Sequence, residues 1–394
     1  MKKAYLDYAA TTPVCFEAYR AMLPYFSARY GNTMSLHQWG KEARVALEQS
    51  RKKISELLNV NSAEIFFTSS ASESNNWVLK GIISAYLPFG RHIIISAIEH
   101  PCIMASAQYL KKLGFEVSIA PVDKVGKLDL EKFEKLIRPD TILVSVMHAN
   151  NEIGTIQPLE EIGEIISQYN KDQRQNLPQV LFHTDASQTF GKININIKKW
   201  KVDLLTASSH KVYGPKGVGL LYIKKDVKIE PFIHGGEQEI GLRASTINVP
   251  AIVGFAKAAE MGWKKMKMEN VRFNKWRKKI IESVLKIKGS SINGSKDESL
   301  PQIINFSFKD IEGESLISLL DFKGIAVSTG SACSSSKLTP SHVLLALGLK
   351  IEEAHSSLRV SLGRYTKDLE IKYFLNELPK VVNQLRKLSP FKTE

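Results

Sequence analysis

An acid and a lysine follow two neighbouring β-rich runs in the middle of the chain. Asp185 comes directly behind the run 180–183, and Lys211 lies just past the run 204–207, in front of a glycine-rich turn. An aspartate that pairs with a pyridinium nitrogen and a lysine that forms a Schiff base are what pyridoxal phosphate requires. Either residue alone fits a structural aspartate or a surface lysine better.

A serine-rich segment offers a site for the phosphate of such a cofactor. Residues 67–76 read Phe-Thr-Ser-Ser-Ala-Ser-Glu-Ser-Asn-Asn, and they follow a strand-like run and open a helix. Backbone N–H groups and hydroxyls at a helix start point toward one spot, which suits a phosphate. A serine-capped helix with Glu73 in its first turn explains the same pattern without a ligand, so both interpretations stay open.

The elements that must position these residues form an α/β pattern. Between residues 60 and 225, β-rich runs alternate with helical stretches, which predicts a mostly parallel sheet flanked by helices. The expected strands are 64–68, 93–96, 117–120, 141–147, 180–183, 204–207 and 219–223. Ligands of such sheets gather outside the carboxyl ends of the strands, where Asp185 and Lys211 lie. A long basic helix after Pro250 and strands from about Gln302 predict a smaller C-terminal domain.

Composition indicates an ordinary globular protein. The chain has 394 residues, 43% of them apolar, enough for about two domains. We expect a cytoplasmic protein, because Asp7 stands where a signal peptide needs an apolar run and no stretch is long enough for a membrane span. The net charge of +14 gathers in residues 264–279. An apolar stripe behind these lysines favours a solvated helix face over nucleic-acid binding.

The three cysteines, Cys15, Cys102 and Cys333, are scattered along the chain. They have no Cys-x-x-Cys spacing and no histidines at metal-ligand distance, so we expect neither a disulfide framework nor a metal site. Cys333 lies in the small and polar stretch 327–337, which predicts an exposed loop. By itself this stretch fits a turn cysteine better than a nucleophile.

Seven short motifs occur in order along nearly the whole chain, from Tyr5 to about Arg364. They are Asp7-Tyr8-Ala9-Ala10-Thr11-Thr12-Pro13, Gly31-Asn32, Glu99-His100-Pro101, Asn150-Asn151-Glu152-Ile153-Gly154-Thr155, His183-Thr184-Asp185, Ser209-His210-Lys211 and Gly330-Ser331-Ala332-Cys333. Together they resemble the cysteine desulfurases of the NifS/IscS type, fold-type I pyridoxal-phosphate enzymes of the class V aminotransferase group. The resemblance implies a large α/β domain, residues 14–260, with a mostly parallel seven-stranded sheet. Residues 1–13 and 261–394 would form a smaller α+β domain.

The activity that the resemblance implies is the removal of sulfur from L-cysteine, giving L-alanine and a persulfide on Cys333. Lys211 would hold pyridoxal 5′-phosphate and move the Cα proton, and His100 would stack on the ring and act as acid or base. The other implied cofactor ligands are Ala71, Ser72, Asn151, Asp185, Gln188, Ser208, His210 and Thr246. Of these, Thr246 would come from the partner subunit of a homodimer. Asn151 and Arg359 would hold the substrate, the arginine as a bidentate clamp on its carboxylate.

The resemblance leaves several points open. The sulfur would pass to an unidentified acceptor protein, for iron–sulfur cluster assembly or tRNA thiolation. An aminotransferase or carbon–sulfur lyase of the same fold would need Lys211 but not Cys333, and a catalytically idle interaction partner would need neither. The chain also departs from the family at Ser70 and Ser245, where small residues or glycine are usual, and at Ser72, where threonine is usual. If position 245 has a positive φ, the serine there costs about 1 kcal/mol.

Overall fold

The computed structural model describes residues 3–329 and 339–388, so Cys333 lies outside the described residues. Its largest element is a sheet of seven strands: β2 (Ile65–Thr68), β3 (His92–Ser96), β4 (Glu116–Ala120), β5 (Thr141–Ser145), β6 (Leu181–Asp185), β7 (Leu204–Ser208) and β8 (Gly219–Ile223). The strand order is β2-β8-β7-β6-β5-β3-β4. Strand β8 runs antiparallel to both of its neighbours, and the other pairs are parallel. The expected seven-stranded, mostly parallel sheet is thereby confirmed.

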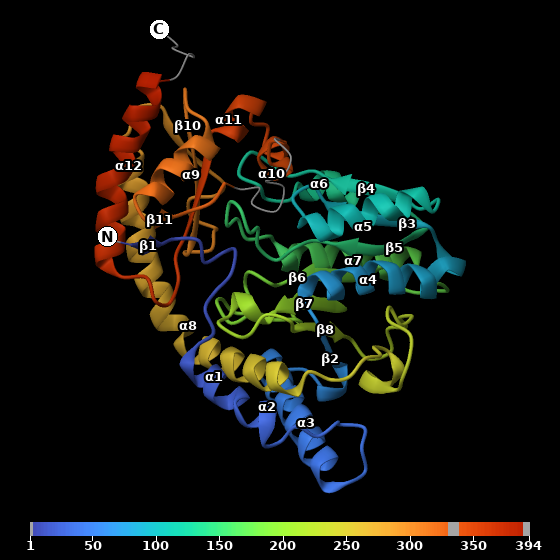
Figure 1. Ribbon diagram of the computed structural model, residues 1–394. Helices are drawn as coiled ribbons and strands as arrows, with labels where there is room; N and C mark the ends of the chain where they lie inside the picture. The colour runs from blue at the N-terminus through green and yellow to red at the C-terminus, as the bar shows by residue number, and fades with distance from the viewer. Residues whose placement is uncertain (1–2, 330–338, 389–394) are drawn as a thin grey trace.

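Helices cover both faces of this sheet (Figure 1). They are α3 (Gln38–Leu58), α4 (Ala71–Tyr86), α5 (Pro101–Lys112), α7 (Leu159–Gln173) and the first half of α8 (Val249–Val284). Ile93 and Ile95 of β3 belong to the apolar core under α4 and α5. Ile94 belongs to the core on the other face, with residues of α3, α7 and α8. Because both faces are buried, β3, β5 and β8 each contain at least three consecutive apolar or aromatic residues.

A second body with its own apolar core packs beside the sheet. Its strands are β1 (Ala4–Tyr5), β9 (Ser290–Asn293), β10 (Ile303–Phe308), β11 (Ile325–Ala326) and β12 (Ser357–Ser361), and its main helices are α9 (Gly313–Phe322) and α12 (Asp368–Leu388). Strands β9, β10 and β12 form an antiparallel sheet, and β1 pairs in parallel with β11. Ala4 and Tyr5, near the start of the described chain, thus lie in this body.

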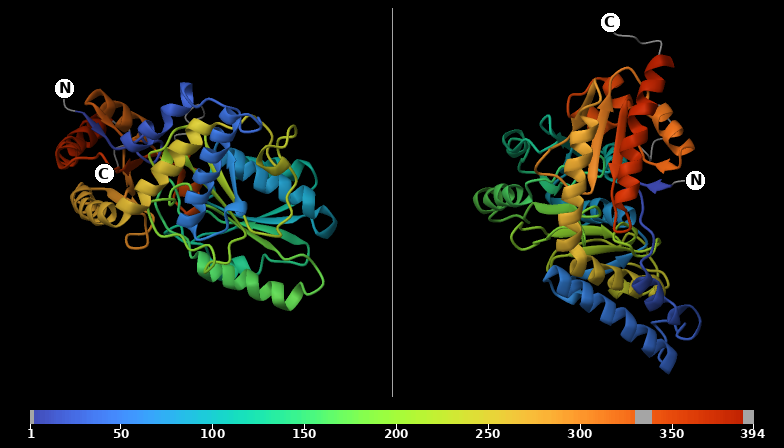
Figure 2. Two further views of the ribbon diagram at one scale, coloured as in Figure 1. Left: turned by 90° about the horizontal axis from the view of Figure 1, so that it is seen from below. Right: turned by 90° about the vertical axis from the view of Figure 1, so that its left-hand side faces the viewer.

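The helix α8 runs through both bodies, and the N-terminal segment between β1 and α1 also passes from one to the other (Figure 1). Helix α8 runs without interruption for 36 residues from the sheet into the second body, as Figure 2 shows. The division of the chain at residues 13/14 and 260/261 stays a prediction.

Shorter helices complete the chain: α1 (Phe16–Met22), α2 (Pro24–Ser27), α6 (Leu130–Glu134), α10 (His342–Ala346) and α11 (Ile351–His355). Within the described ranges, no helix is both long enough and apolar enough to cross a lipid bilayer.

Candidate active site

The carboxyl ends of β6 and β7 open into a cavity of about 860 Å³ between the sheet and the second body. Ten of the residues expected at the site line it: Ala71, Ser72, His100, Asn151, Asp185, Gln188, Ser208, His210, Lys211 and Arg359. Thr246 is exposed and is not part of the lining of its own chain. The cavity therefore brings together side chains that are as much as 288 positions apart, from Ala71 to Arg359.

Asp185, the last residue of β6, is a buried carboxylate held by two donors. The side-chain amide of Asn75 donates to Oδ2 at 2.7 Å, and the backbone N–H of Ser187 donates to Oδ1 at 2.8 Å. Among the ion pairs of the described residues, none involves Asp185. A buried carboxylate is most stable beside a positive charge, and a protonated ring nitrogen would supply one.

Lys211 ends a short 3-10 turn, η3 (Ser209–Lys211), directly behind β7. Its Nζ donates to the backbone oxygens of Ala9 and Ala10, at 2.6 and 2.7 Å. The amine therefore lies at the cavity wall, and its bonds tie the N-terminal segment of the second body to the sheet.

His100 caps the N-terminus of α5 with its imidazole. Its Nδ1 accepts the backbone N–H of Cys102 at 3.2 Å and lies 3.0 Å from the Cys102 sulfur. Burial lowers the pKa of His100 below its ordinary value of 6.5; the nearby Lys211 and His342 lower it further, while Asp185 opposes the shift. At pH 7 this imidazole is therefore neutral and can take or give a proton at the cavity.

The start of α4 forms one wall of the cavity. Ser70 is the N-cap, and its side chain accepts the backbone N–H of Glu73 at 3.1 Å. Burial alone would raise the pKa of Glu73, but two bonds from Arg243, at 2.8 and 3.1 Å, together with the Ser69 donors, lower it. The serine-capped helix is thus confirmed. Because Arg243 offsets the Glu73 charge, an anion at this helix start meets little repulsion.

His210 and Ser208 lie at the same end of the cavity as the start of α4. His210 is partly buried, and its Nδ1 lies 3.1 Å from the Thr11 hydroxyl. Burial, helped by Lys211 and two further lysines, lowers the pKa of His210 to about 4. This imidazole therefore contributes hydrogen bonds and no charge at neutral pH.

Arg359, in the middle of β12, reaches the opposite end of the cavity. It is 3% exposed; its Nη2 donates to Asp7 at 2.9 Å and its Nη1 to the backbone oxygen of Asn151 at 3.1 Å. Its buried Nε has no hydrogen-bond partner among the described residues. The guanidinium is therefore held in place with donor capacity to spare for a carboxylate.

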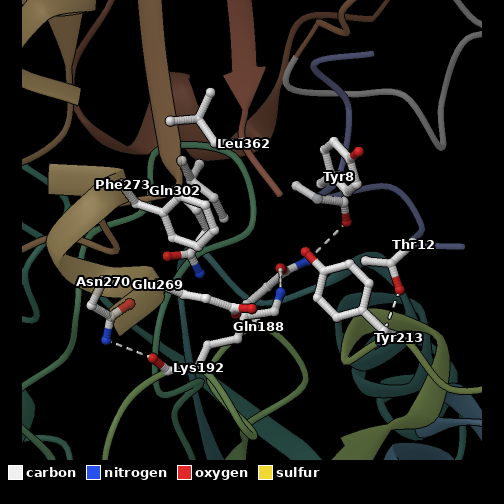
Figure 3. A pocket seen from close by; sticks show the side chains of 12 residues that line it. Tyr8, Thr12, Gln188, Lys192, Tyr213, Glu269, Asn270, Phe273, Gln302 and Leu362 are labelled. Carbon is white, nitrogen blue, oxygen red and sulfur yellow. Dashed lines mark hydrogen bonds between the residues drawn. The ribbon is translucent and has the colours of Figure 1, made fainter. Parts of the chain in front are cut away.

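Gln188 lines both the main cavity and a smaller one of about 10 Å³, which has room for about one water molecule and is drawn in Figure 3. Its Nε2 donates to the backbone oxygen of Ala9 at 3.0 Å, and Lys192 donates to its Oε1 at 3.4 Å. Burial lowers the pKa of Lys192 to about 7; Lys211 adds to the shift and Glu269 opposes it. This lysine therefore fixes the orientation of the Gln188 amide with less than a full charge.

Sequence reasoning gave no role to two residues of the cavity, Asn75 and Cys102. A signal existed for both. Asn75 stands four positions after Ala71, hence on the same helix face as the residue that opens α4. Cys102 follows His100 by two positions, within reach of an N-capping side chain.

Comparisons with known proteins agree with this geometry. Residues 4–374 match the family model described as aminotransferase class-V. A cysteine desulfurase IscS of Dictyoglomus turgidum is 47% identical, over all of this chain and 98% of that protein. A cysteine desulfurase IscS 1 of Archaeoglobus fulgidus is 49% identical over 98% of each chain.

Solved structures give the same answer. A NifS-like protein covers 98% of this chain and all of its own, with a TM-score of 0.91 and 40% identity. A structure of SspA in complex with cysteine covers 93% of this chain and all of its own, with a TM-score of 0.79 and 35% identity. The chain therefore belongs to the class-V aminotransferase family and, within it, to the cysteine desulfurases of the NifS/IscS type.

Proposed function

We propose that this protein takes sulfur from L-cysteine with the help of pyridoxal 5′-phosphate and passes it to its own Cys333. The observation that carries the proposal is that Asp185, Lys211, His100 and Arg359 line one cavity. The relatives are named cysteine desulfurases, and one similar structure holds cysteine. A protein that only bound a partner would have no physical need for this set of residues.

The donor set of the cavity fits the cofactor. Asp185 is a buried carboxylate that forms no ion pair with the described residues, Lys211 offers an amine at the wall, and the start of α4 offers N–H groups and hydroxyls for a phosphate. Ala71, Ser72, Ser208 and His210 would hold the phosphate. When bound, the cofactor supplies an electron sink for the charge that develops at Cα of an amino acid.

The residues of this chain would divide the remaining work. Arg359 would bind the carboxylate of cysteine through the N–H groups that Asp7 and Asn151 leave unused, which fixes the position of the amino acid in the cavity. Lys211 takes the proton from Cα and can return it, and neutral His100 takes or gives a proton at the amino or thiol group of the substrate. Gln188 would donate a hydrogen bond to the ring oxygen of the cofactor, and Lys192 fixes the orientation of the Gln188 amide.

The sulfur step needs a thiolate, and Cys333 would supply it. Its sulfur attacks the substrate sulfur, so that an S–S bond forms and the bond between Cβ and sulfur breaks. The electron pair stays with Cβ, which gains a proton. Cysteine and the enzyme thiol thereby give alanine and an enzyme persulfide, and no outside oxidant is required. Cys333 lies outside the described residues, so this role rests on the resemblance to the cysteine desulfurases together with the sequence of its stretch.

A second copy of the chain and an acceptor protein complete the proposal. Thr246 is exposed and away from its own cavity, which suits a residue that reaches the phosphate of the other subunit. Mixed dimers of Lys211→Ala and Thr246→Ala subunits test this. If Thr246 acts across the dimer, one of the two sites is intact and activity returns; if it acts within its own subunit, every site carries a defect. The sulfur acceptor we expect is a scaffold protein or a tRNA-thiolation relay protein, and we expect the enzyme itself to work in the cytoplasm.

The deciding experiment is a single turnover of the purified enzyme with L-cysteine, stopped with an alkylating agent. We expect one alanine per active site and one extra sulfur on the peptide that contains Cys333. Because Cys102 also lines the cavity, mass spectrometry must assign the modified residue. In Cys333→Ser, cofactor absorbance and cysteine binding should persist while persulfide disappears.

Two results would contradict the proposal. Unchanged sulfur transfer by Cys333→Ser would remove that residue from the reaction. Formation of pyridoxamine phosphate, or release of free sulfide with Cys333 unmodified, would favour the aminotransferase or the carbon–sulfur lyase of the same fold.

A further inference from the structure

A chain of hydrogen bonds links the Asp185 carboxylate to the His100 imidazole through two residues. The hydroxyl of Thr206 donates to Oδ1 of Asn75 at 2.6 Å, and Nδ2 of Asn75 donates to Asp185 at 2.7 Å. The same Nδ2 lies 3.3 Å from the Cys102 sulfur, which lies 3.0 Å from Nδ1 of His100. These hydrogen bonds therefore connect a residue of β6 and a residue of β7 to the helix α4 and to the N-cap of α5.

The donor and the acceptor of each of these hydrogen bonds follow from the Asp185 carboxylate. A carboxylate accepts hydrogen bonds and does not donate, so the amide atom beside Asp185 must be the NH₂ of Asn75. Thr206 bonds the remaining oxygen, and the second N–H of the amide then points to the sulfur of Cys102. Cys102 is therefore an acceptor on its Asn75 side.

The thiol hydrogen of Cys102 is left for His100. Burial and the charge of Asp185 raise the pKa of this thiol to about 12, although Asn75 and Ser72 oppose the shift as donors to the sulfur. The thiol is thus protonated. Asn75 and Ser72 donate to its sulfur, so the thiol hydrogen is donated to Nδ1 of His100, which lies 3.0 Å from the sulfur. The backbone N–H of Cys102 points to the same nitrogen. With two donors directed at it, Nδ1 carries a lone pair.

We propose that Asn75 and Cys102 are positioning residues that hold His100 neutral, with its hydrogen on Nε2. The imidazole then reacts only through Nε2, since protonation of Nδ1 would break the helix cap and the thiol contact together. The charged and titratable groups that face it are Asp185 from β6, Lys211 from η3 and His342 from α10. Lys211 and His342 disfavour a cation at His100, as the two donors at Nδ1 do.

The inference rests on the proposed function only for the use that the reaction makes of Nε2. The tautomer itself is a property of the protein without substrate. It can be measured on the full chain, freed of cofactor, by nitrogen NMR with isotope-labelled histidine. The chain has nine histidines, and a His100→Gln variant identifies the signals of His100.

In the unmodified protein we expect an unprotonated Nδ1 and a protonated Nε2 at neutral pH. Cys102→Ser keeps an acceptor and a donor at this position and should keep this pattern. Cys102→Ala removes one donor to the neutral ring, so the pKa of His100 should rise by roughly one unit and a share of the other tautomer should appear. Cys15→Ala is the matched control, because Cys15 is a buried cysteine that does not line the cavity.

A protonated Nδ1 in the unmodified protein would overturn the inference, and so would a Cys102→Ala protein that titrates as the unmodified one does. In the holoenzyme, the acid limb of the single-turnover rate should move to higher pH in Cys102→Ala by the shift that NMR measures. An altered titration in a protein that never desulfurates cysteine would reject the proposed function and leave the positioning role standing.

Discussion

The two ends of the cavity are built in different ways. At the cofactor end, Asp185, Ser208 and Lys211 lie at the ends of two adjacent strands of one sheet. Asn75 donates to Asp185 at 2.7 Å and accepts the hydroxyl of Thr206 at 2.6 Å. At the substrate end, Arg359 comes from the second body and is held by Asp7 and by a backbone oxygen.

This difference separates the chemistry from the selection of substrate. Groups on one sheet keep a fixed spacing, whatever the second body does. A guanidinium that reaches across from another body depends on how the two bodies dock. Changes at the cofactor end should therefore lower rate constants, and changes at the substrate end should weaken binding.

The largest effect should come from the cofactor end. Lys211→Ala removes the amine that is proposed to hold the cofactor and to take the Cα proton, and single-turnover formation of alanine should fall at least about a thousandfold. Thermal unfolding should change little beyond the loss of the bonds to Ala9 and Ala10. A modest drop in rate with full persulfide formation would place the base elsewhere and break the comparison.

The next largest effect should come from the substrate end. Arg359→Lys replaces a fork of donors by a point charge, and the loss of one charge-assisted bond should raise KM for cysteine by about 10- to 100-fold. The turnover number should change much less. Steady-state kinetics at several cysteine concentrations measure both values, with the partly exposed Arg138→Lys as the matched control. A fall in kcat at constant KM would contradict the separation of the two ends.

A smaller effect concerns Glu99, whose side chain and backbone each bond to a residue that lines the cavity. Its Oε1 accepts the N–H of Met147, and its backbone oxygen bonds to His342. Burial raises the pKa of the Glu99 carboxyl well above 4.5. The folded protein therefore keeps a proton that the unfolded chain releases, so this group lowers the free energy of unfolding as pH rises from about 4.5 through the raised pKa.

Glu99→Gln has no carboxyl to ionise, so it removes this fall in the free energy of unfolding at high pH. Chemical denaturation should show a gain in stability for Glu99→Gln at pH 8 and little gain at pH 4, with about 1.4 kcal/mol for each unit of the shift. The exposed Glu352→Gln should show no such pH dependence. Equal gains at both pH values would mean that the carboxyl is ionised in the folded protein.

The smallest effect should come from Ser245, which lies in the segment that carries Thr246. Its φ is +117°, in a region that glycine adopts freely and serine does not. Ser245→Gly should therefore stabilise the protein by about 0.5–1 kcal/mol, which urea denaturation can measure. Ser84→Gly, at an exposed position in the last turn of α4, should have the opposite sign.

The same contrast explains how much the sequence could predict. Parallel strands bring their carboxyl ends to one edge, so Asp185 and Lys211 could be placed together from their runs alone. Arg359 entered only through the family resemblance, because no local pattern connects β12 to the sheet. Asn75 and Cys102 were missed because their roles depend on contacts between separate elements. Strand β9, four residues of mostly polar sequence, forms only because β10 pairs with it.

The uninterrupted helix α8 has a mechanical consequence for the cavity. Within the described chain it contributes to the cores of both bodies, and its only proline is at the second helical position. A hinge there would require broken i to i−4 bonds in the middle of a helix about 54 Å long. A change in how the two bodies dock would therefore have to bend this helix, and it would change the distance from Arg359 to Asp185 and with it the length of amino acid that the cavity accepts.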